Sequence, residues 1–426
     1  MSESTALVRN AAFSRLWGAQ VLSQVAQNLL NFALIIRIFD LAQHTRLANV
    51  SVALLILSFG IPSILFAAAA GVCVDHWNRR WVMVITNLLR ALLVLGYLLF
   101  EHNLAVVLVL SFVISAITQF FIPAEASAIP ALVKPKHLLR ANSLFIFTLY
   151  ASFIVGYSAS APVIGVFGST GPYYVTSVMF LLATLLVLGL PNMRNESSAP
   201  VRFWEIVRST PREVMSNWRI IRSNHKLSFP ITQLTLTQAT VGVLLALAPA
   251  LSLAVLHTSI QGASHVLIIP AGAGMVLGVV MLGRLSGWLP RVRLISGALM
   301  VAGAALLLLG LTGLLHRTVN GHDIATQAEI GIIVGTLVLT LGFMNAVVSA
   351  AAQTLIQENT TEATRGRVFG ALNMMINIAA TLPVFFAGIL ADLTSVTKVV
   401  AALGGALFVF AVGQWFLLRH RQQLDS

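Results

Sequence analysis

Residues 71–80 read Gly-Val-Cys-Val-Asp-His-Trp-Asn-Arg-Arg and connect two long apolar runs, which extend over residues 48–74 and 81–100. Each run is long enough to cross a bilayer, because a membrane-spanning α-helix needs about 20 mostly apolar residues. Arg79 and Arg80 carry charges that stay in water at the membrane surface. We therefore predict two membrane-spanning helices that are joined by a tight loop at one membrane face.

The whole chain has the composition of a membrane protein. Of its 426 residues, 58% are hydrophobic and only 9% are charged, and the mean hydropathy is +0.89, whereas a soluble domain has about 25% charged residues. The lone cysteine, Cys73, excludes an internal disulfide framework and a four-cysteine metal site. The net charge of +12 does not indicate a nucleic-acid partner, because basic residues of membrane proteins gather in the cytoplasmic loops.

Apolar runs of spanning length recur along the chain and are bounded by Gly, Pro or charged residues. The predicted spans are residues 16–39, 48–74, 81–100, 104–129, 143–166, 173–190, 227–256, 266–285, 294–315, 330–356, 368–390 and 399–418. The first span is rich in carboxamides and lacks a small-residue cleavage site, so we expect it to be retained rather than removed as a signal peptide. The sequence thus predicts an all-α integral membrane protein of twelve helices.

One long polar segment, residues 192–226, divides the spans into six and six. We predict an N-terminal six-helix half at residues 1–191, a cytoplasmic linker at residues 192–226 and a C-terminal half at residues 227–426. Within the linker, apolar residues at near-helical spacing alternate with arginines, which favours a helix that lies on the membrane surface. Those apolar residues are Trp204, Val214, Met215, Trp218 and Ile221. A solvated linker without such a helix is the alternative.

The basic residues indicate how the chain is oriented. With twelve spans, both termini lie on one side, and 21 of the 26 Lys and Arg residues fall on that side. The opposite side holds Arg37, Arg46, Arg317 and Lys398, and Arg90 falls inside a span. Because Lys and Arg concentrate in cytoplasmic loops, we predict a multi-pass protein of the cell membrane with both termini in the cytoplasm.

The loop at residues 71–80 resembles the signature loop of the major facilitator superfamily. A weaker echo, Gly283-Arg-Leu-Ser-Gly287-Trp-Leu-Pro-Arg291, lies between spans eight and nine, as expected of a duplicated half. We expect Gly71 to allow close helix packing and Asp75 to face a helix N-terminus or an arginine at the cytoplasmic side. The resulting candidate cytoplasmic gate comprises Gly71, Asp75, Arg79, Arg80, Arg90, Gly283, Gly287, Arg291, Arg365 and Arg367.

Further stretches resemble one branch of that superfamily, the exporters that include macrolide-efflux and enterobactin-exporter proteins. The resemblance lies in residues 123–133, 139–144 and 357–370. It implies the two-half major facilitator fold, spans one, four, seven and ten around a central cavity, and outward transport of a small molecule. Span five departs from the branch, because Gly156-Tyr-Ser-Ala-Ser-Ala161 replaces its Gly-Pro and Gly-Gly pairs. A second departure is Glu125, which stands where the branch often carries a basic residue.

Uncharged polar side chains recur on three of these spans. In span one they are spaced by three and four residues, so they form one stripe on a helix. The candidate cavity residues are Gln20, Gln24, Gln27, Asn28, Asn31, Gln233, Thr237, Gln238, Thr240, Asn345, Ser349 and Gln353. Since lipid does not accept carboxamides, the stripe faces a cavity or other helices. We favour a polar, mostly uncharged cavity, and the alternative is hydrogen bonding between helices, worth about 0.6 to 2 kcal/mol per contact.

Two ionisable residues lie within or beside the spans of the N-terminal half. Arg90 is deep enough that an unpaired guanidinium would cost about 2.5 kcal/mol or more, so we expect a partner, with Asp75 and Glu125 as the available acids. Proton coupling needs a carboxylate in the cavity. Glu125 is the best single candidate for that coupling acid.

Other chemistry finds little support in the sequence. Gly272, Gly274 and Gly278 lie in a span without the flanking strand of a dinucleotide site, so they indicate helix packing. No ATP-binding Walker string occurs, the histidines lack metal-ligand spacing, and we expect neither a cofactor nor a metal. We predict a monomeric secondary exporter of a small amphipathic or hydrophobic molecule that works by alternating access. The alternatives are a lipid or lysophospholipid flippase on the same fold and, in other classes, a membrane sensor or a membrane-embedded enzyme.

Overall fold

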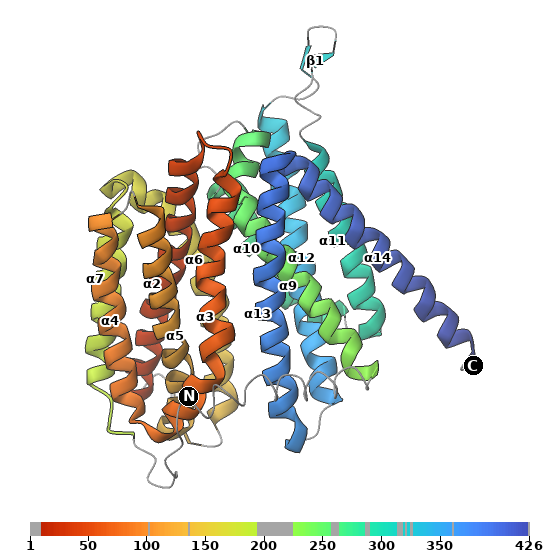
Figure 1. Ribbon diagram of the computed structural model, residues 1–426. Helices are drawn as coiled ribbons and strands as arrows, with labels where there is room; N and C mark the ends of the chain where they lie inside the picture. Colours follow the sequence, from red (N-terminus) through yellow and green to blue (C-terminus); the bar gives the residue numbers. More distant parts are fainter. Residues whose placement is uncertain are drawn as a thin grey trace. The chain divides into compact units, whose positions relative to one another are not determined.

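The computed structural model describes residues 10–100, 103–134, 137–193, 225–256, 264–285, 290–312, 318–319, 322–323, 327–359 and 362–424. Twelve α-helices account for most of these residues (Figure 1). Before the segment 194–224 they are α2 (Ala11–Ala42), α3 (Ala48–His76), α4 (Arg79–Phe100), α5 (Leu104–Leu132), α6 (Leu138–Phe167) and α7 (Gly171–Leu188). After it they are α9 (His225–Leu251), α10 (Ile269–Leu285), α11 (Arg291–Leu311), α12 (Gln327–Glu358), α13 (Glu362–Leu393) and α14 (Val396–Leu424).

Every predicted span coincides with one of these helices, which confirms the all-α membrane fold. Eleven helices among the described residues are long and apolar enough to cross a bilayer, and a shorter apolar helix covers Val266–Leu282. Apart from its ends, a helix satisfies its backbone hydrogen bonds internally, whereas lipid offers the backbone no hydrogen-bond partners. Short π-helical turns, η2 (Ser252–Leu256) and η3 (Ser264–Ile268), extend α9 and precede α10. Two-residue strands, β1 (Thr318–Val319) and β2 (His322–Asp323), pair antiparallel in the connection between α11 and α12.

The chain forms two compact units. Unit 1 consists of Met1–Ile38 and Leu57–Glu213, and unit 2 consists of Phe39–Ile56 and Val214–Ser426. Helix α3 therefore begins in unit 2 and continues in unit 1. The predicted halves stay a prediction, because the proposed linker and its surface helix, with Trp204, Val214, Met215, Trp218 and Ile221, lie outside the described residues.

Each unit has its own apolar core. In unit 1, α2, α4, α5 and α7 contribute fully buried side chains such as Phe13, Met83, Phe121 and Val187. In unit 2 the corresponding core is built by α9, α11, α12, α13 and α14. Since lipid is as apolar as leucine, helices in a membrane associate mainly through close packing and polar contacts.

Glycines bring pairs of helices together in unit 2. A Cβ atom added to Gly274 of α10 would lie 2.0 Å from the carbonyl oxygen of Leu339 in α12, and one on Gly278 would lie 2.6 Å from that of Phe343. The backbones of α10 and α12 are therefore in contact where the glycines face α12. This confirms the expected packing role of Gly274 and Gly278.

Candidate functional site

The polar stripe of α2 divides into a buried part and a partly exposed part. Gln20 is 3% exposed, and its Nε2 donates a hydrogen bond of 3.2 Å to the carbonyl oxygen of Phe145 in α6. The remaining stripe residues, Gln24, Gln27, Asn28 and Asn31, are partly exposed. Gln27 Nε2 donates to Asn31 Oδ1 over 2.8 Å, one helical turn away. Gln20 therefore serves helix packing, whereas the other four side chains are partly exposed, although Gln27 Oε1 itself is buried.

In unit 2, α9 and α12 bring two of the candidate residues together. Asn345 Nδ2 of α12 donates to Gln238 Oε1 of α9 over 3.4 Å. Gln233, five residues earlier in α9, is fully buried and donates from Nε2 to Gln414 Oε1 of α14 over 2.8 Å. Gln233 thus forms the interhelical hydrogen bond that was the alternative to a cavity role. Ser349 is 9% exposed, and Gln353 is partly exposed on the same helix.

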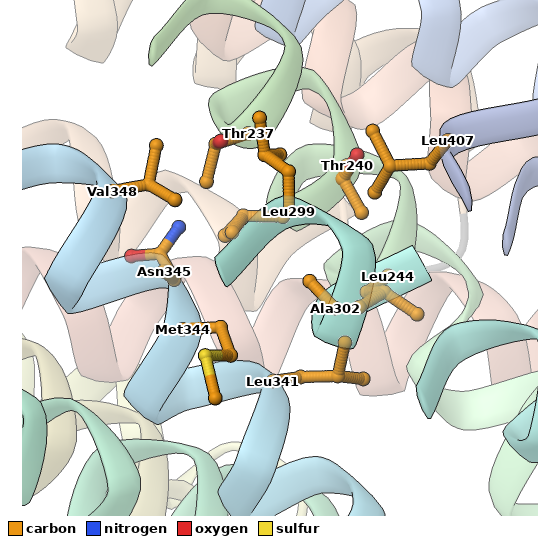
Figure 2. A pocket seen from close by; sticks show the side chains of 11 residues that line it. Thr237, Thr240, Leu244, Leu299, Ala302, Leu341, Met344, Asn345, Val348 and Leu407 are labelled. Carbon is orange, nitrogen blue, oxygen red and sulfur yellow. The ribbon is translucent and has the colours of Figure 1, made fainter. Parts of the chain in front are cut away.

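A small cavity of about 30 Å³ lies inside unit 2 between α9, α11, α12 and α14. Figure 2 shows Thr237, Thr240 and Asn345 around it, with leucine, methionine and valine side chains on its other sides. Both threonine hydroxyls already donate to carbonyl oxygens of α9, at 2.8 and 2.9 Å. This volume suits about one water molecule, so this cavity is too small to hold an organic substrate.

Unit 1 contains a buried polar cluster around Arg90 of α4, whose side chain is 1% exposed. Its Nη2 donates to Ser23 Oγ of α2 over 3.0 Å and to Asn87 Oδ1 over a shorter distance. The guanidinium also lies 4.5 Å from the ring centres of both Phe121 and Phe180. Two oxygen acceptors and two aromatic faces offset the cost of burying this cation.

Glu125 of α5 completes this cluster. Its side chain is 6% exposed, and it interacts electrostatically with Arg90. Three buried atoms of the cluster have no hydrogen-bond partner, namely Glu125 Oε1, Arg90 Nε and Asn87 Nδ2. Of the two acids expected near Arg90, Glu125 thus interacts with it electrostatically, without an ion pair within 4.0 Å, and the side chain of Asp75 lies outside what the structure describes. The neutral partners Ser23 and Asn87 were not predicted, although Asn87 precedes Arg90 by three residues and shares its helix face.

A carboxylate of α13 caps the first turn of α3 within unit 2. Asp392 Oδ1 accepts from Asn49 N at 3.1 Å and from Asn49 Nδ2 at 2.7 Å, and Oδ2 accepts from Val50 N at 2.9 Å. Leu47, which precedes α3, and Ala48, its first residue, have no side-chain acceptor, so the free N–H groups of the helix need an acceptor from elsewhere. The helix N-terminus also favours the negative charge. We call this contact the Asp392 cap.

The structure describes part of the candidate cytoplasmic gate. Arg80 Nη2 donates to the carbonyl oxygen of Leu188 at the end of α7 over 2.6 Å, and Arg79 N donates to that of Met193 over 3.1 Å. These bonds tie the loop at residues 71–80 to the end of α7. Arg291 pairs with Glu358 across the ends of α11 and α12.

The expected packing role of Gly71 is wrong, because a Cβ atom added there would meet nothing within 4 Å. Gly71 therefore faces open space in unit 1 rather than a neighbouring helix. The structure does not describe Gly287, the surroundings of Gly283, or the side chains of Asp75, Arg365 and Arg367.

Helices of spanning length with polar side chains within them define a polytopic membrane protein. The family model of the Major Facilitator Superfamily matches residues 16–382, so the chain belongs to this superfamily. This confirms the family resemblance of the loop at residues 71–80.

Several characterised and uncharacterised proteins are similar to the chain. The uncharacterized MFS-type transporter YfiS of Bacillus subtilis is 25% identical over 399 residues, which are 92% of this chain and 90% of YfiS. Macrolide efflux protein A of Streptococcus pyogenes is 24% identical over 391 residues, or 89% of each chain. A third relative, YkuC of Bacillus subtilis, is 30% identical but is matched over only 42% of its length.

Solved structures share the fold at lower identity. An inward-facing bacterial homolog of the human lysosomal transporter Spinster gives a TM-score of 0.73 at 13% identity and covers 96% of both chains. The POT family transporter PepTSo gives the same TM-score at 13% identity, with 97% of this chain and 98% of that chain covered. These similarities support the fold of the whole chain.

Proposed function

We propose that this protein exports a small amphipathic or apolar organic molecule by alternating access. The observation that carries the proposal is the row of partly exposed carboxamides on α2, which contains no charged side chain from Gln24 to Asn31. Neutral hydrogen-bonding groups on an otherwise apolar helix suit a ligand with few polar atoms. The similarity to macrolide efflux protein A supports the outward direction.

Efflux from proteoliposomes tests this function. The full chain would be reconstituted with a panel of fluorescent hydrophobic compounds, including a macrolide, and a labelled lysophospholipid. We expect energised efflux of at least one organic compound, and Gln24→Leu with Gln27→Leu to reduce it. Gln43→Leu is the matched control, because Gln43 is exposed and bonds only locally to Asp40. Movement of the lysophospholipid alone would favour a flippase, and equal effects of the control would contradict the role of the stripe.

We propose that protons drive the export and bind at Glu125. A buried carboxyl group that interacts electrostatically with Arg90 and has Oε1 unpaired can change its protonation state when the cluster opens to water. Glu125→Gln keeps the shape of the side chain and removes the titration. We expect the variant to lose uphill efflux driven by a pH gradient and to retain exchange of labelled for unlabelled substrate. Loss of both activities, or of neither, would contradict coupling at Glu125.

We propose a monomer with both termini in the cytoplasm and with the candidate gate at that side. The 21 basic residues on the side of the termini support this orientation. A cysteine introduced at Ser426 in a Cys73→Ser background should react with an impermeant reagent only in inside-out vesicles. Reaction in right-side-out vesicles would contradict the proposed orientation.

We propose that the Asp392 cap takes part in alternating access at the end of the helices opposite the candidate gate. Helix α3 begins in unit 2 and continues in unit 1. A movement that bends or shifts α3 therefore either breaks the cap or carries Asp392 along with the beginning of α3. Pro62 lies inside α3 six residues beyond Ile56, where the helix leaves unit 2. Proline removes a backbone hydrogen bond and allows a helix to bend. We propose that release of the cap accompanies opening of the outer side.

A further inference from the structure

A groove of about 670 Å³ lies between α13 and α14 of unit 2. Figure 1 shows the two helices meeting at their short connection and separating along their length. Apolar side chains line almost all of the groove, among them Phe386, Leu390 and Leu403, and Val243 of α9 forms its floor. Phe386 is 61% exposed and Leu390 is 51% exposed, so the groove is open toward the membrane.

The groove has the length of one lipid leaflet. Its lining follows α13 from Leu382 and reaches Thr394, just after the helix ends, and twelve steps of about 1.5 Å span about 18 Å. The hydrocarbon core of a bilayer is about 30 Å thick, so one leaflet contributes about 15 Å. A groove of this length accommodates an acyl chain along its whole extent.

A cation marks one end of the groove. Lys398 lies in the first turn of α14, is exposed, and lines the groove beside Thr394. Among the described residues, no carboxylate forms an ion pair with Lys398, and the nearby Asp392 is occupied by the first turn of α3. The N-terminus of α14 adds partial positive charge at the same place. This end of the groove thus offers an ammonium group to an anion at the membrane surface.

We infer that the groove between α13 and α14 binds an anionic phospholipid, with an acyl chain along the apolar walls and the phosphate at Lys398. The site is separate from the α2 stripe and from the cavity near Asn345. Binding of lipid here fills the space between two helices that are otherwise in contact mainly at their connection. The inference does not rest on the proposed transport activity, because lipid binding is measurable without substrate.

Native mass spectrometry of the purified full chain tests this site. The protein would be titrated with phosphatidylglycerol and with phosphatidylcholine of identical acyl chains. We expect phosphatidylglycerol to be retained about fivefold more than phosphatidylcholine, which corresponds to one lysine near a lipid phosphate. Glycerol phosphate, which has the anion without the chains, should not compete.

Two variants separate the charge from the groove. Lys398→Gln should abolish the preference for phosphatidylglycerol, and Ala402→Trp should reduce binding of both lipids, because Ala402 is exposed in the groove. Lys134→Gln is the matched control, since Lys134 is an exposed lysine in unit 1, and it should leave binding unchanged. The inference is overturned if wild-type protein retains both lipids equally, if Lys398→Gln behaves as wild type, or if Lys134→Gln causes the same loss.

Discussion

Replacement of Asp392 by asparagine probes the contact that holds the beginning of α3 within unit 2. The carboxylate accepts three hydrogen bonds, two of them from backbone N–H groups of Asn49 and Val50. Asparagine can keep the bonds to one oxygen, but its amino group cannot accept from Val50 N. The substitution also removes a negative charge from a helix N-terminus.

The expected loss follows from these contacts. A hydrogen bond to a charged group contributes about 1.5 to 3 kcal/mol, and a charge at a helix terminus contributes about 0.3 to 1 kcal/mol. Because asparagine keeps part of the contact, we expect a loss of about 2 kcal/mol. A change of this size shifts the equilibrium between the capped and uncapped states about 30-fold.

Labelling of a buried cysteine next to the cap measures this shift. Ala53 is fully buried, and a Cβ atom added to Gly388 of α13 would lie 2.9 Å from its Cβ. In a Cys73→Ser background, Ala53→Cys should react slowly with a membrane-impermeant maleimide, and Asp392→Asn should raise that rate about 30-fold. The rate rises because Ala53 becomes accessible only when the beginning of α3 separates from α13.

Two controls test whether the change in labelling is local to the cap. Asp40→Asn removes an exposed carboxylate that accepts from Gln43 over 2.7 Å, and it should not change the labelling rate. Ala183→Cys, buried in the core of unit 1, should stay protected in the Asp392→Asn variant. An unchanged rate at residue 53, an equal rise with Asp40→Asn, or exposure of residue 183 would refute the local role of the cap.

Three further substitutions test the packing and the buried charges. Gly274→Ala should lower the melting temperature in detergent by about 5 °C, because the added Cβ meets the backbone of α12. Gly297→Ala is the control and should leave the melting temperature unchanged, because a Cβ there meets nothing within 4 Å. Equal melting temperatures of the two variants would contradict the close approach of α10 and α12. Arg90→Met should lower the melting temperature by leaving Glu125 without its cation. Adding Glu125→Gln to this variant should restore part of the lost melting temperature. If the double variant instead loses the sum of the two single losses, the two residues are not coupled. Arg291→Ala should change the free energy of unfolding by less than about 1 kcal/mol, because its ion pair is exposed, and a larger loss in denaturant titration would show that this pair is structural.

The helices were predictable because the membrane itself sets their length. Spanning requires about 20 apolar residues whatever the helix contacts, so local hydropathy locates each span. The helix ends were less predictable. Helix α13, for example, begins at Glu362 and ends at Leu393, beyond the predicted 368–390, because helical hydrogen bonding continues into the interface after the apolar run has ended.

The partners of the polar side chains were not predictable from their pattern. Lipid excludes a carboxamide that faces a cavity and a carboxamide that bonds a neighbouring helix alike, so both give the same sequence pattern. Gln20 and Gln233 proved to bond Phe145 and Gln414, and only the tertiary arrangement distinguishes them from the partly exposed Gln24. The Asp392 cap escaped prediction for the same reason, because its donor and acceptor are more than 340 residues apart.

The buried charges and the neutral polar groups are distributed differently between the units. Among the residues whose side chains the structure describes, Arg90 and Glu125 are the only buried basic and acidic side chains, and both belong to unit 1. The buried polar side chains of unit 2 are hydroxyls and carboxamides, such as Gln233 and Ser349. A protonation event at Glu125 would therefore change the charge within the core of unit 1 and leave the polar groups of unit 2 neutral. Under the proposed mechanism, the proton is held in unit 1, at Glu125.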